Sequence, residues 1–211
     1  MGSVVITNVY IDGFNLYYGA LRNSPHRWLD LEKLCGLLLP GNRIVRIKYF
    51  TALVSARPDN PDQPARQRTY LRALGTLPKV SVHLGHFLSH VVTMPLAVPP
   101  GQPQEYVKVI KTEEKGSDVA LATELLNDAH WNRFEAAVLV TNDSDLLPPI
   151  KIARHELGKV VGVINPQRHP SRVLMAHAHF VKKIRPGALA VSQFPPTLSD
   201  GRGIFAKPPA W

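Results

Sequence analysis

The sequence predicts an α/β domain with a mainly parallel central sheet and helices on both of its faces. Three observations support this prediction. Short apolar runs, typical of strands buried on both faces, alternate along the chain with segments of helical periodicity. Two of these runs stop abruptly at acidic residues. Of the 211 residues, 45% are hydrophobic and 19% are charged, which suits one substantial core and excludes a mainly disordered chain.

In the first part of the chain, apolar strands alternate with helices whose ends carry clear signals. The apolar run at 4–11 ends at Asp12-Gly13, as expected of a buried strand. Asp30 is the expected N-cap of a helix that stops at Pro40-Gly41. The expected elements are, in order, a strand at 4–11, helices at 14–21 and 29–39, a strand at 43–54, a Pro-rich loop, a helix at 65–77 and a strand at 80–84.

The second part of the chain opens with a projecting β-hairpin and then returns to alternation. Residues 87–112 contain a Pro-rich connection before an alternating segment at 106–110, which predicts the hairpin as an insertion. The expected elements are then a helix at 117–128, a strand at 136–140, a helix at 146–157, a strand at 160–164, a helix at 171–176 and a strand at 180–184. This gives one domain over 1–186, followed by a Pro- and Gly-rich C-terminal tail at 187–211.

Composition excludes several classes of protein. No run of about 18 apolar residues occurs, which argues against a membrane span. The N-terminus lacks a basic region before its apolar stretch, so a secretory signal is not expected. Cys35 is the single cysteine, which excludes an intramolecular disulfide and a cysteine-based zinc site. The simplest compartment is therefore a reducing cytoplasm.

The net charge of +9 is concentrated in one part of the chain. Residues 146–211 contain ten Lys and Arg against two acidic residues, Glu156 and Asp200, whereas the first 145 residues are nearly neutral. This asymmetry favours a polyanionic partner, most simply a nucleic acid. A soluble basic surface without a ligand is the alternative.

Acidic residues follow two of the predicted strands. Asp12 ends the first, and Asp143 and Asp145 follow the strand at 136–140, while Asp118 lies at a helix start that can face the same edge. In open α/β sheets, ligands bind outside the carboxyl ends of the strands. Clustered carboxylates repel one another unless a divalent cation neutralises them, and oxygen ligands suit Mg²⁺ or Mn²⁺ better than zinc. The sequence therefore predicts a metal site at this edge.

Each of these acids also has a structural explanation as a helix cap or a turn residue. It is their combined placement at one edge that favours the metal site. Asn15, one turn after Asp12, is the expected auxiliary residue, where it can bind a ligated water or a phosphate.

Three short blocks of the sequence resemble the signature blocks of the NYN domain family, the LabA-like branch of the PIN-like nucleases. They are Ile11-Asp12-Gly13-Phe14-Asn15-Leu16, Glu114-Lys115-Gly116-Ser117-Asp118-Val119-Ala120-Leu121 and Thr141-Asn142-Asp143-Ser144-Asp145-Leu146. The similarity extends over about 4–184. It implies a three-layer, Rossmann-like (PIN-like) fold and RNA cleavage with Mg²⁺ or Mn²⁺.

Carried over position by position, the resemblance assigns metal binding and catalysis to four carboxylates and gives supporting roles to two polar residues. The carboxylates are Asp12, Asp118, Asp143 and Asp145, and the supporting residues are Asn15 and Thr141. Glu124 stands where related sequences often have Asp, and is a further supporting candidate. The hairpin at 87–112 varies in the family, so the resemblance leaves the choice of RNA open.

On this interpretation, one or two metal ions orient a scissile phosphate and lower the pKa of a bound water, leaving a 5′-phosphate and a 3′-hydroxyl. Basic side chains then hold the RNA backbone, and aromatic residues stack on unpaired bases. The basic candidates are Lys111, Lys115, Arg66, Arg68, Arg72, Lys151, Arg154 and Lys159, and the aromatic candidates are Tyr106, Trp131 and Phe134. The RNA is single-stranded or structured, and a homodimer is among the options for assembly.

Two other functions compete with a ribonuclease. One is a non-catalytic RNA-binding or regulatory module on the same fold. The other is a phosphohydrolase of small esters that uses Asp143 and Asp145 as a nucleophile pair, although such a pair is expected on the first strand. The spacing of His83, His86 and His90 would suggest zinc on a helix, but a strand and loop are predicted there. No Gly-rich phosphate loop occurs, which disfavours ATP or NAD chemistry.

Overall fold

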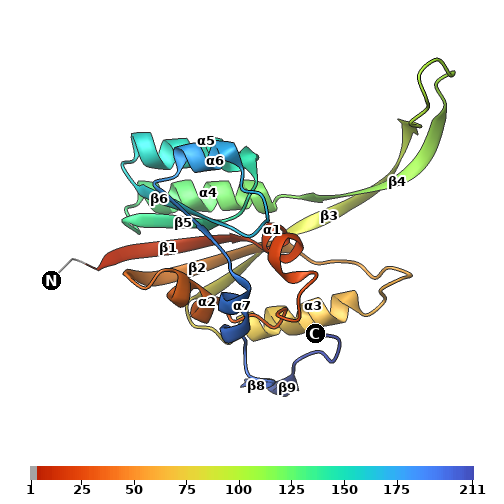
Figure 1. Ribbon diagram of the computed structural model, residues 1–211. Helices are drawn as coiled ribbons and strands as arrows, with labels where there is room; N and C mark the ends of the chain where they lie inside the picture. Colours follow the sequence, from red (N-terminus) through yellow and green to blue (C-terminus); the bar gives the residue numbers. More distant parts are fainter. Residues whose placement is uncertain (1–3) are drawn as a thin grey trace.

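The structure, a computed structural model, describes residues 4–211 and contains a seven-stranded sheet between two layers of helices (Figure 1). The strand order is β4-β3-β2-β1-β5-β6-β7, and all neighbours are parallel except β3 and β4. The strands are β1 (Val5–Asp12), β2 (Asn42–Ala52), β3 (Val80–Pro95), β4 (Tyr106–Lys115), β5 (Ala136–Val140), β6 (Val160–Asn165) and β7 (Phe180–Lys183). The α/β class with a mainly parallel sheet is confirmed.

The core has two halves, one on each face of the sheet, because successive side chains of the central strands point to opposite faces. In β1, Val9 and Ile11 face one side of the sheet and Tyr10 faces the other, and all three are fully buried. Successive side chains of a strand point to opposite faces, so an apolar run of this kind needs helices on both sides. Figure 1 shows α2, α3 and α7 below the sheet and α4, α5 and α6 above it.

Except for α7, which was not predicted, the helices begin and end close to the positions that the sequence predicts. The α-helices are α1 (Gly13–Leu16), α2 (Leu31–Leu38), α3 (Gln63–Leu74), α4 (Ser117–His130), α5 (Leu147–Lys151), α6 (Arg172–His177) and α7 (Pro186–Val191). A π-helical turn, η1 (Tyr17–Leu21), continues α1. A 3₁₀ turn, η2 (Ser144–Leu146), precedes α5, and a π-helical turn, η3 (Ile152–Glu156), continues it. The predicted cap of α2 is confirmed, because the Lys33 backbone N–H donates to Asp30 Oδ1 at 3.0 Å.

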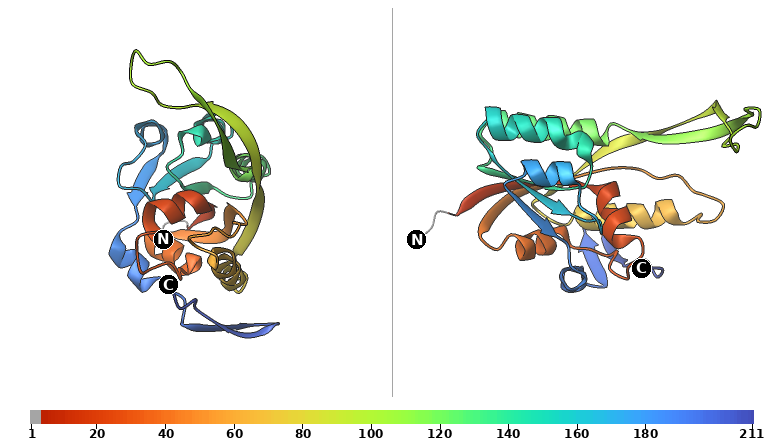
Figure 2. Two further views of the ribbon diagram at one scale, coloured as in Figure 1. Left: turned by 90° about the vertical axis from the view of Figure 1, so that its right-hand side faces the viewer. Right: turned by 45° about the horizontal axis from the view of Figure 1, so that its top comes forward.

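The projecting hairpin is present, but one of its strands is longer than predicted. β3 does not stop at Leu84: its first residues pair with β2, and from His86 to Pro95 it pairs antiparallel with β4. Gly85 lies at the change of partner, where a Cβ would come within 2.6 Å of the Lys115 carbonyl oxygen. One strand therefore belongs to both the sheet and the hairpin, which extends well beyond the helical layers (Figure 2).

Residues 187–211, predicted as a tail, instead fold back onto the domain. They contain most of α7 and a small hairpin of β8 (Thr197–Asp200) and β9 (Gly203–Ala206). Phe194 is 5% exposed, with its ring 5.5 Å from that of Trp28, and Trp28 Nε1 donates to the Pro195 carbonyl oxygen at 2.8 Å. Proline and glycine mark turns in this segment, while its few apolar side chains complete the lower core.

We expect Phe194→Ala to lower the free energy of unfolding by about 3 kcal/mol, because it leaves a cavity beside Trp28. Urea unfolding followed by tryptophan fluorescence measures this change. Val191→Ala, at a side chain that is 69% exposed in the same segment, is the matched control and changes stability by less than about 0.5 kcal/mol. If Phe194→Ala and Val191→Ala changed the free energy of unfolding by the same amount, the segment at 187–211 would not stabilise the core.

Among residues 4–211, none of the helices combines the length and the apolar character that crossing a bilayer requires.

Candidate metal centre at the carboxyl ends of β1 and β5

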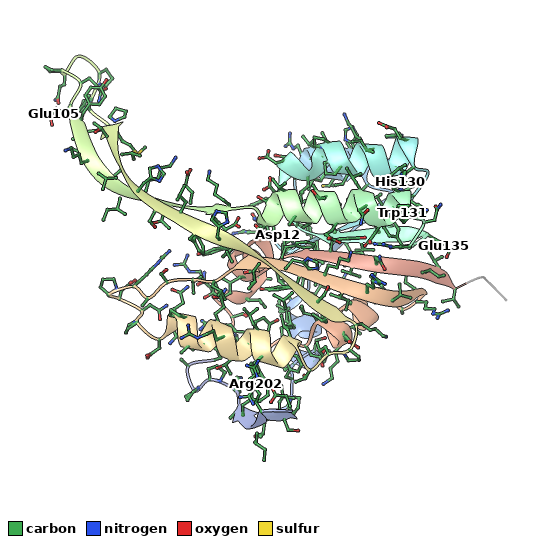
Figure 3. All side chains as sticks on the ribbon, turned by 180° about the vertical axis from the view of Figure 1, so that it is seen from behind. Asp12, Glu105, His130, Trp131, Glu135 and Arg202 are labelled. Atoms are coloured by element: carbon green, nitrogen blue, oxygen red, sulfur yellow. The ribbon has the colours of Figure 1, made fainter. Side chains whose placement is uncertain are left out.

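The candidate site lies where the order of the strands reverses. From β1 the chain moves to β2 and β3 on one side, and it later returns to place β5, β6 and β7 on the other side. Ile11 pairs with Val140, so the residues that follow β1 and β5 emerge side by side. This reversal point is the usual ligand site of an open α/β sheet. Figure 3 shows Asp12 close to the place where the hairpin leaves the sheet.

Asp12 is the most tightly held of the predicted carboxylates. It is 4% exposed and accepts three hydrogen bonds, from Asn15 N at 2.9 Å, Asn15 Nδ2 at 2.7 Å and Thr141 Oγ1 at 3.1 Å. Gly13 lets the chain turn directly after it, because a Cβ there would lie 2.7 Å from the Phe50 carbonyl oxygen. The carboxylate therefore has one orientation.

Asn15 and Thr141, both predicted to support the site, join the two strand ends. The Thr141 hydroxyl donates to Asp12 and accepts from the Asp143 backbone N–H at 3.1 Å. Asn15 Oδ1 accepts from Asn142 N at 3.2 Å and from Gln167 Nε2 at 3.0 Å while its amide N–H donates to Asp12. These two side chains fix the loop after β1 against the loop after β5.

Three of the four predicted carboxylates, Asp12, Asp118 and Asp143, line one open cavity of about 600 Å³, here called the acidic cavity. Asp118 reaches it from the first turn of α4. Asp145 is exposed and is not part of its lining, although its charge contributes to raising the pKa of Asp118. Glu114 also lines the acidic cavity and accepts from Ser117 Oγ at 2.7 Å.

The carboxylates of the acidic cavity perturb one another. Burial, together with the charges of Asp12 and Asp143, raises the pKa of Asp118 to about 6. Burial also raises the pKa of Asp12, against the hydrogen bonds from Asn15 and Thr141. Within residues 4–211, neither of these acids nor Asp143 or Asp145 forms a salt bridge. Their negative charge is therefore not neutralised by a paired basic side chain.

This donor set fits a hard divalent cation, because it offers carboxylate oxygens and excess negative charge. The carboxylates line one cavity, but their side chains are not drawn close together. In the described part of the chain, no three His, Cys, Asp or Glu side chains converge closely enough to hold an ion in their present positions. The arrangement is a set of neighbouring oxygen donors whose repulsion a cation would relieve.

Glu124, the further supporting candidate, lies outside the acidic cavity. Its carboxylate pairs with Lys48 at 2.5 Å, and the same ammonium contacts Asp128 at 2.5 Å. Glu124 is almost two helical turns beyond Asp118, which places it over the middle of β2 rather than at the end of the sheet. The prediction that it supports the site is therefore wrong in this structure.

Lys111 and Lys115 point away from the acidic cavity. Their neighbours Thr112 and Glu114 line it, and alternation along β4 sends Lys111 and Lys115 to the opposite face of the hairpin. There both ammonium groups pair with Glu113, at 2.7 Å and 3.3 Å. The sequence shows that both lysines lie near the start of α4, but it could not determine the register that turns their side chains away from the acidic cavity.

The other basic candidates are scattered over the molecule. Arg72 is held by Asp200 in a two-pronged ion pair at 2.7 Å and lies over the Phe205 ring. Because η3 runs back along the sheet, Arg154 and Lys159 lie toward the end of the sheet opposite to the acidic cavity. There Arg154 donates to the His177 carbonyl oxygen and Lys159 donates to Asn132 Oδ1. Arg66 bonds Asn60, whereas Arg68 and Lys151 are on helices and form no salt bridge in the described part of the chain.

The aromatic candidates and His83 lie away from the site or serve the core. Phe134 is buried, Tyr106 is near the tip of the hairpin, and Trp131 is at the far end of α4 from the hairpin (Figure 3). His83 stacks on Phe50 at 4.8 Å between ring centroids, within β3 rather than on a helix.

Sequence reasoning missed two charged residues that line the acidic cavity. Arg57 is its basic residue and comes from the loop between β2 and α3, and Glu114 belongs to β4. Glu114 carried a signal, because an acid three residues before Ser117 can accept hydrogen bonds from the start of a helix. Arg57 carried none beyond its place in a loop that follows a parallel strand.

A second, smaller cavity of about 120 Å³ adjoins the acidic cavity and is here called the aromatic pocket. The two share Phe14, Tyr18, Val54 and Gln63 in their linings. Its rings come from the segment after β1, from β2 and α3, and from the C-terminus: Phe14, Tyr17, Tyr18, Tyr49, Tyr70 and Trp211.

We expect Asn15→Ala to slow any reaction at the acidic cavity by about 10- to 100-fold without unfolding the protein. The substitution keeps the backbone hydrogen bond to Asp12 but removes the one from Nδ2, and it also removes the oxygen that holds Asn142 N. Steady-state rates and thermal melting measure the two effects. Asn127→Ala, at an exposed residue of α4, is the control, and an equal slowing there would contradict the role of Asn15.

The chain is similar to known proteins at the level of family and of fold. A family model described as "NYN domain" matches residues 6–185. The 6-hydroxy-3-succinoylpyridine 3-monooxygenase HspA of Pseudomonas putida is 33% identical, over 97% of this chain and 75% of that protein. A crystal structure of a protein of unknown function from Vibrio parahaemolyticus superposes with a TM-score of 0.58 at 18% identity, over 88% of this chain and 98% of that one, and shows a common fold.

Proposed function

This chain belongs to the NYN domain family, and from that premise we propose that it is a ribonuclease that hydrolyses RNA phosphodiester bonds with Mg²⁺ or Mn²⁺. The family implies a PIN-like nuclease fold. The observation that most supports the proposal is the acidic cavity itself. Asp12, Asp118 and Asp143 line it at the strand reversal, and none of them has a basic partner within salt-bridge distance among residues 4–211.

Each side chain then has a distinct part. Asp12 and Asp143 would hold the metal directly, and Asp118 would hold metal or the attacking water from the first turn of α4. Asp145 contributes charge from outside the cavity, while Asn15 and Thr141 keep Asp12 oriented. When bound, the ion would lower the pKa of a water and offset negative charge on the leaving oxygen.

The RNA backbone would enter along the hairpin. Phe87, Ser89 and Thr112 line the acidic cavity from β3 and β4, and Arg57 supplies a positive charge from the loop after β2. A guanidinium suits a phosphate because it can donate two parallel hydrogen bonds. Lys111 and Lys115, on the other face of the hairpin, would act on more distant phosphates only.

A non-catalytic RNA-binding module is the alternative on the same fold. It is supported by the open arrangement of the carboxylates, which are gathered but do not converge. The discriminating observation is cleavage: a module of this kind retains RNA and metal without cutting.

A second candidate function comes from the Pseudomonas putida relative, whose name is that of a 6-hydroxy-3-succinoylpyridine 3-monooxygenase. A monooxygenase puts one atom of O₂ into its substrate and reduces the other to water with two electrons from a donor. The aromatic pocket is the place in this chain where a single flat ring would fit, since Tyr18 and Trp211 line it.

One panel of assays separates these functions. The purified protein is given end-labelled RNA, single-stranded DNA or a generic phosphomonoester with Mn²⁺, Mg²⁺ or EDTA, and in a parallel arm 6-hydroxy-3-succinoylpyridine with O₂ and NADH. We expect cleavage of RNA that requires the metal. Hydrolysis of the monoester alone would indicate a phosphohydrolase, and consumption of the pyridine with oxidation of NADH would indicate the monooxygenase.

A further inference from the structure

The aromatic pocket differs from the acidic cavity in chemistry, although the two share a wall. None of the residues that line the aromatic pocket is acidic, and two of them, Arg27 and Arg66, are basic. The acidic cavity contains four carboxylates. A ligand that occupies both cavities must therefore pair a group that binds at a metal site with an uncharged or electron-rich ring.

The size of the aromatic pocket favours one ring. Its volume of about 120 Å³ lies below the range of about 300–1,000 Å³ for sites that hold drug-sized ligands. The acidic cavity, at about 600 Å³, has room for a stretch of phosphodiester backbone. A nucleotide matches this division, because its base is a single flat group attached to its phosphate through the ribose.

The side chains on the shared wall are suited to hold a base. Phe14 and Tyr18 follow Asp12 within two turns of the chain, and Phe14 is itself supported by an edge contact with Phe87 at 5.8 Å. Tyr18 is 50% exposed, so part of its ring is open to a ligand. Stacking of one base on an aromatic side chain strengthens binding by about tenfold or more. Gln63, also on the wall, can donate to and accept from a base edge.

We propose that the aromatic pocket binds one unstacked base of an RNA strand, next to the phosphate held at the acidic cavity, with Tyr18 stacking on the base and Gln63 contacting its edge. The proposal rests on the proposed function, since it deepens the description of the same substrate. It makes the protein selective for single-stranded RNA, because a base in a duplex is stacked and paired.

The test is an abasic scan measured as binding, which does not depend on cleavage. A set of short fluorescein-labelled RNAs carries one abasic ribose at each successive position. Its affinity for the full chain is measured by polarisation with Ca²⁺, whose charge can neutralise the carboxylates of the acidic cavity, and with EDTA as the metal-free comparison. For the unmodified protein we expect one position at which loss of the base weakens binding about tenfold. Tyr18→Ala should abolish the difference at that position, and Tyr18→Phe should retain it.

Trp131→Ala is the matched control, because Trp131 is 64% exposed and lies at the far end of α4 (Figure 3). It should leave the abasic profile unchanged. Gln63→Ala should alter which base is preferred at the sensitive position. A flat profile, or the same tenfold effect in Tyr18→Ala as in the unmodified protein, would overturn the proposal. If the profile shows a sensitive position that depends on Tyr18 but the protein never cuts RNA, the proposed base-binding site stands and the proposed nuclease activity is refuted.

Discussion

Replacing Asp143 by asparagine should reduce metal-dependent RNA cleavage about a thousandfold, which corresponds to a loss of about 4 kcal/mol of transition-state stabilisation. The substituted side chain has the same size and its amide oxygen can still accept the hydrogen bond from Asp145 N, so the fold should be retained. A neutral amide is a weaker metal ligand than a carboxylate. Single-turnover cleavage of labelled RNA measures the rate, and circular dichroism checks the fold.

Two matched carboxylates make this prediction specific. Asp145→Asn should cost less than about tenfold, because Asp145 is exposed and lies outside the lining of the acidic cavity. Asp59→Asn, at an exposed residue of the loop after β2, should have no effect. Equal losses for Asp143 and Asp59 would mean that cleavage depends on general charge and not on this cavity.

Replacing Asp118 by asparagine should abolish most of the activity and, without metal, stabilise the protein. Burial and the neighbouring charges raise the pKa of Asp118 to about 6, above the value of 3.8 that it has when unperturbed. The folded state therefore holds this proton more tightly than the unfolded state, and stability is lost as the pH rises through about 6. Because the group is partly exposed, solvent screening reduces the gain from removing its charge to about 1 kcal/mol.

Urea unfolding in EDTA at about pH 8 and about pH 4 measures the effect. We expect Asp118→Asn to raise the free energy of unfolding at the higher pH and to change it little at the lower pH, where the carboxyl group is protonated in the folded state. Adding Mn²⁺ should then stabilise the unmodified protein more than the variant, because a ligand stabilises the state that binds it. A variant that is less stable than the unmodified protein at about pH 8 would show that the acidic cavity is not under electrostatic strain.

Much of the fold follows from the sequence because its strands are continuous apolar runs. Residues 4–11 and 136–140 read as buried strands, and the acids after them indicated the functional end of the sheet. The prediction failed where strand periodicity gave no boundary: β3 continues through Gly85 into the hairpin, and 187–211 packs on Trp28 despite its Pro and Gly content. The length of β3 and the packing of 187–211 do not depend on local propensity, because both are determined by contacts with residues far away in the sequence.

At the candidate site too, some residues could be predicted from the sequence and others could not. Asp12 and Asn15 were predicted from their positions and Thr141 from the family resemblance, and the structure joins all three by hydrogen bonds. The roles of basic residues could not be predicted, because a one-residue change of register on β4 decides whether Lys111 or Thr112 faces the cavity. Arg57 came to the site through the path of a loop, which no periodic pattern encodes.

The ends of the cleaved RNA report directly on the reaction that we propose. Labelled RNA is incubated with the purified protein in Mn²⁺, in Mg²⁺ and in EDTA, and the product termini are identified by enzymatic treatment and mass spectrometry. We predict cleavage in either metal and none in EDTA, with 5′-phosphate and 3′-hydroxyl ends, because hydrolysis by water at the metal site would break the bond between phosphorus and the 3′ oxygen. Cleavage that persists in EDTA and leaves 2′,3′-cyclic phosphates, or no cleavage under any condition, would contradict a metal-dependent nuclease.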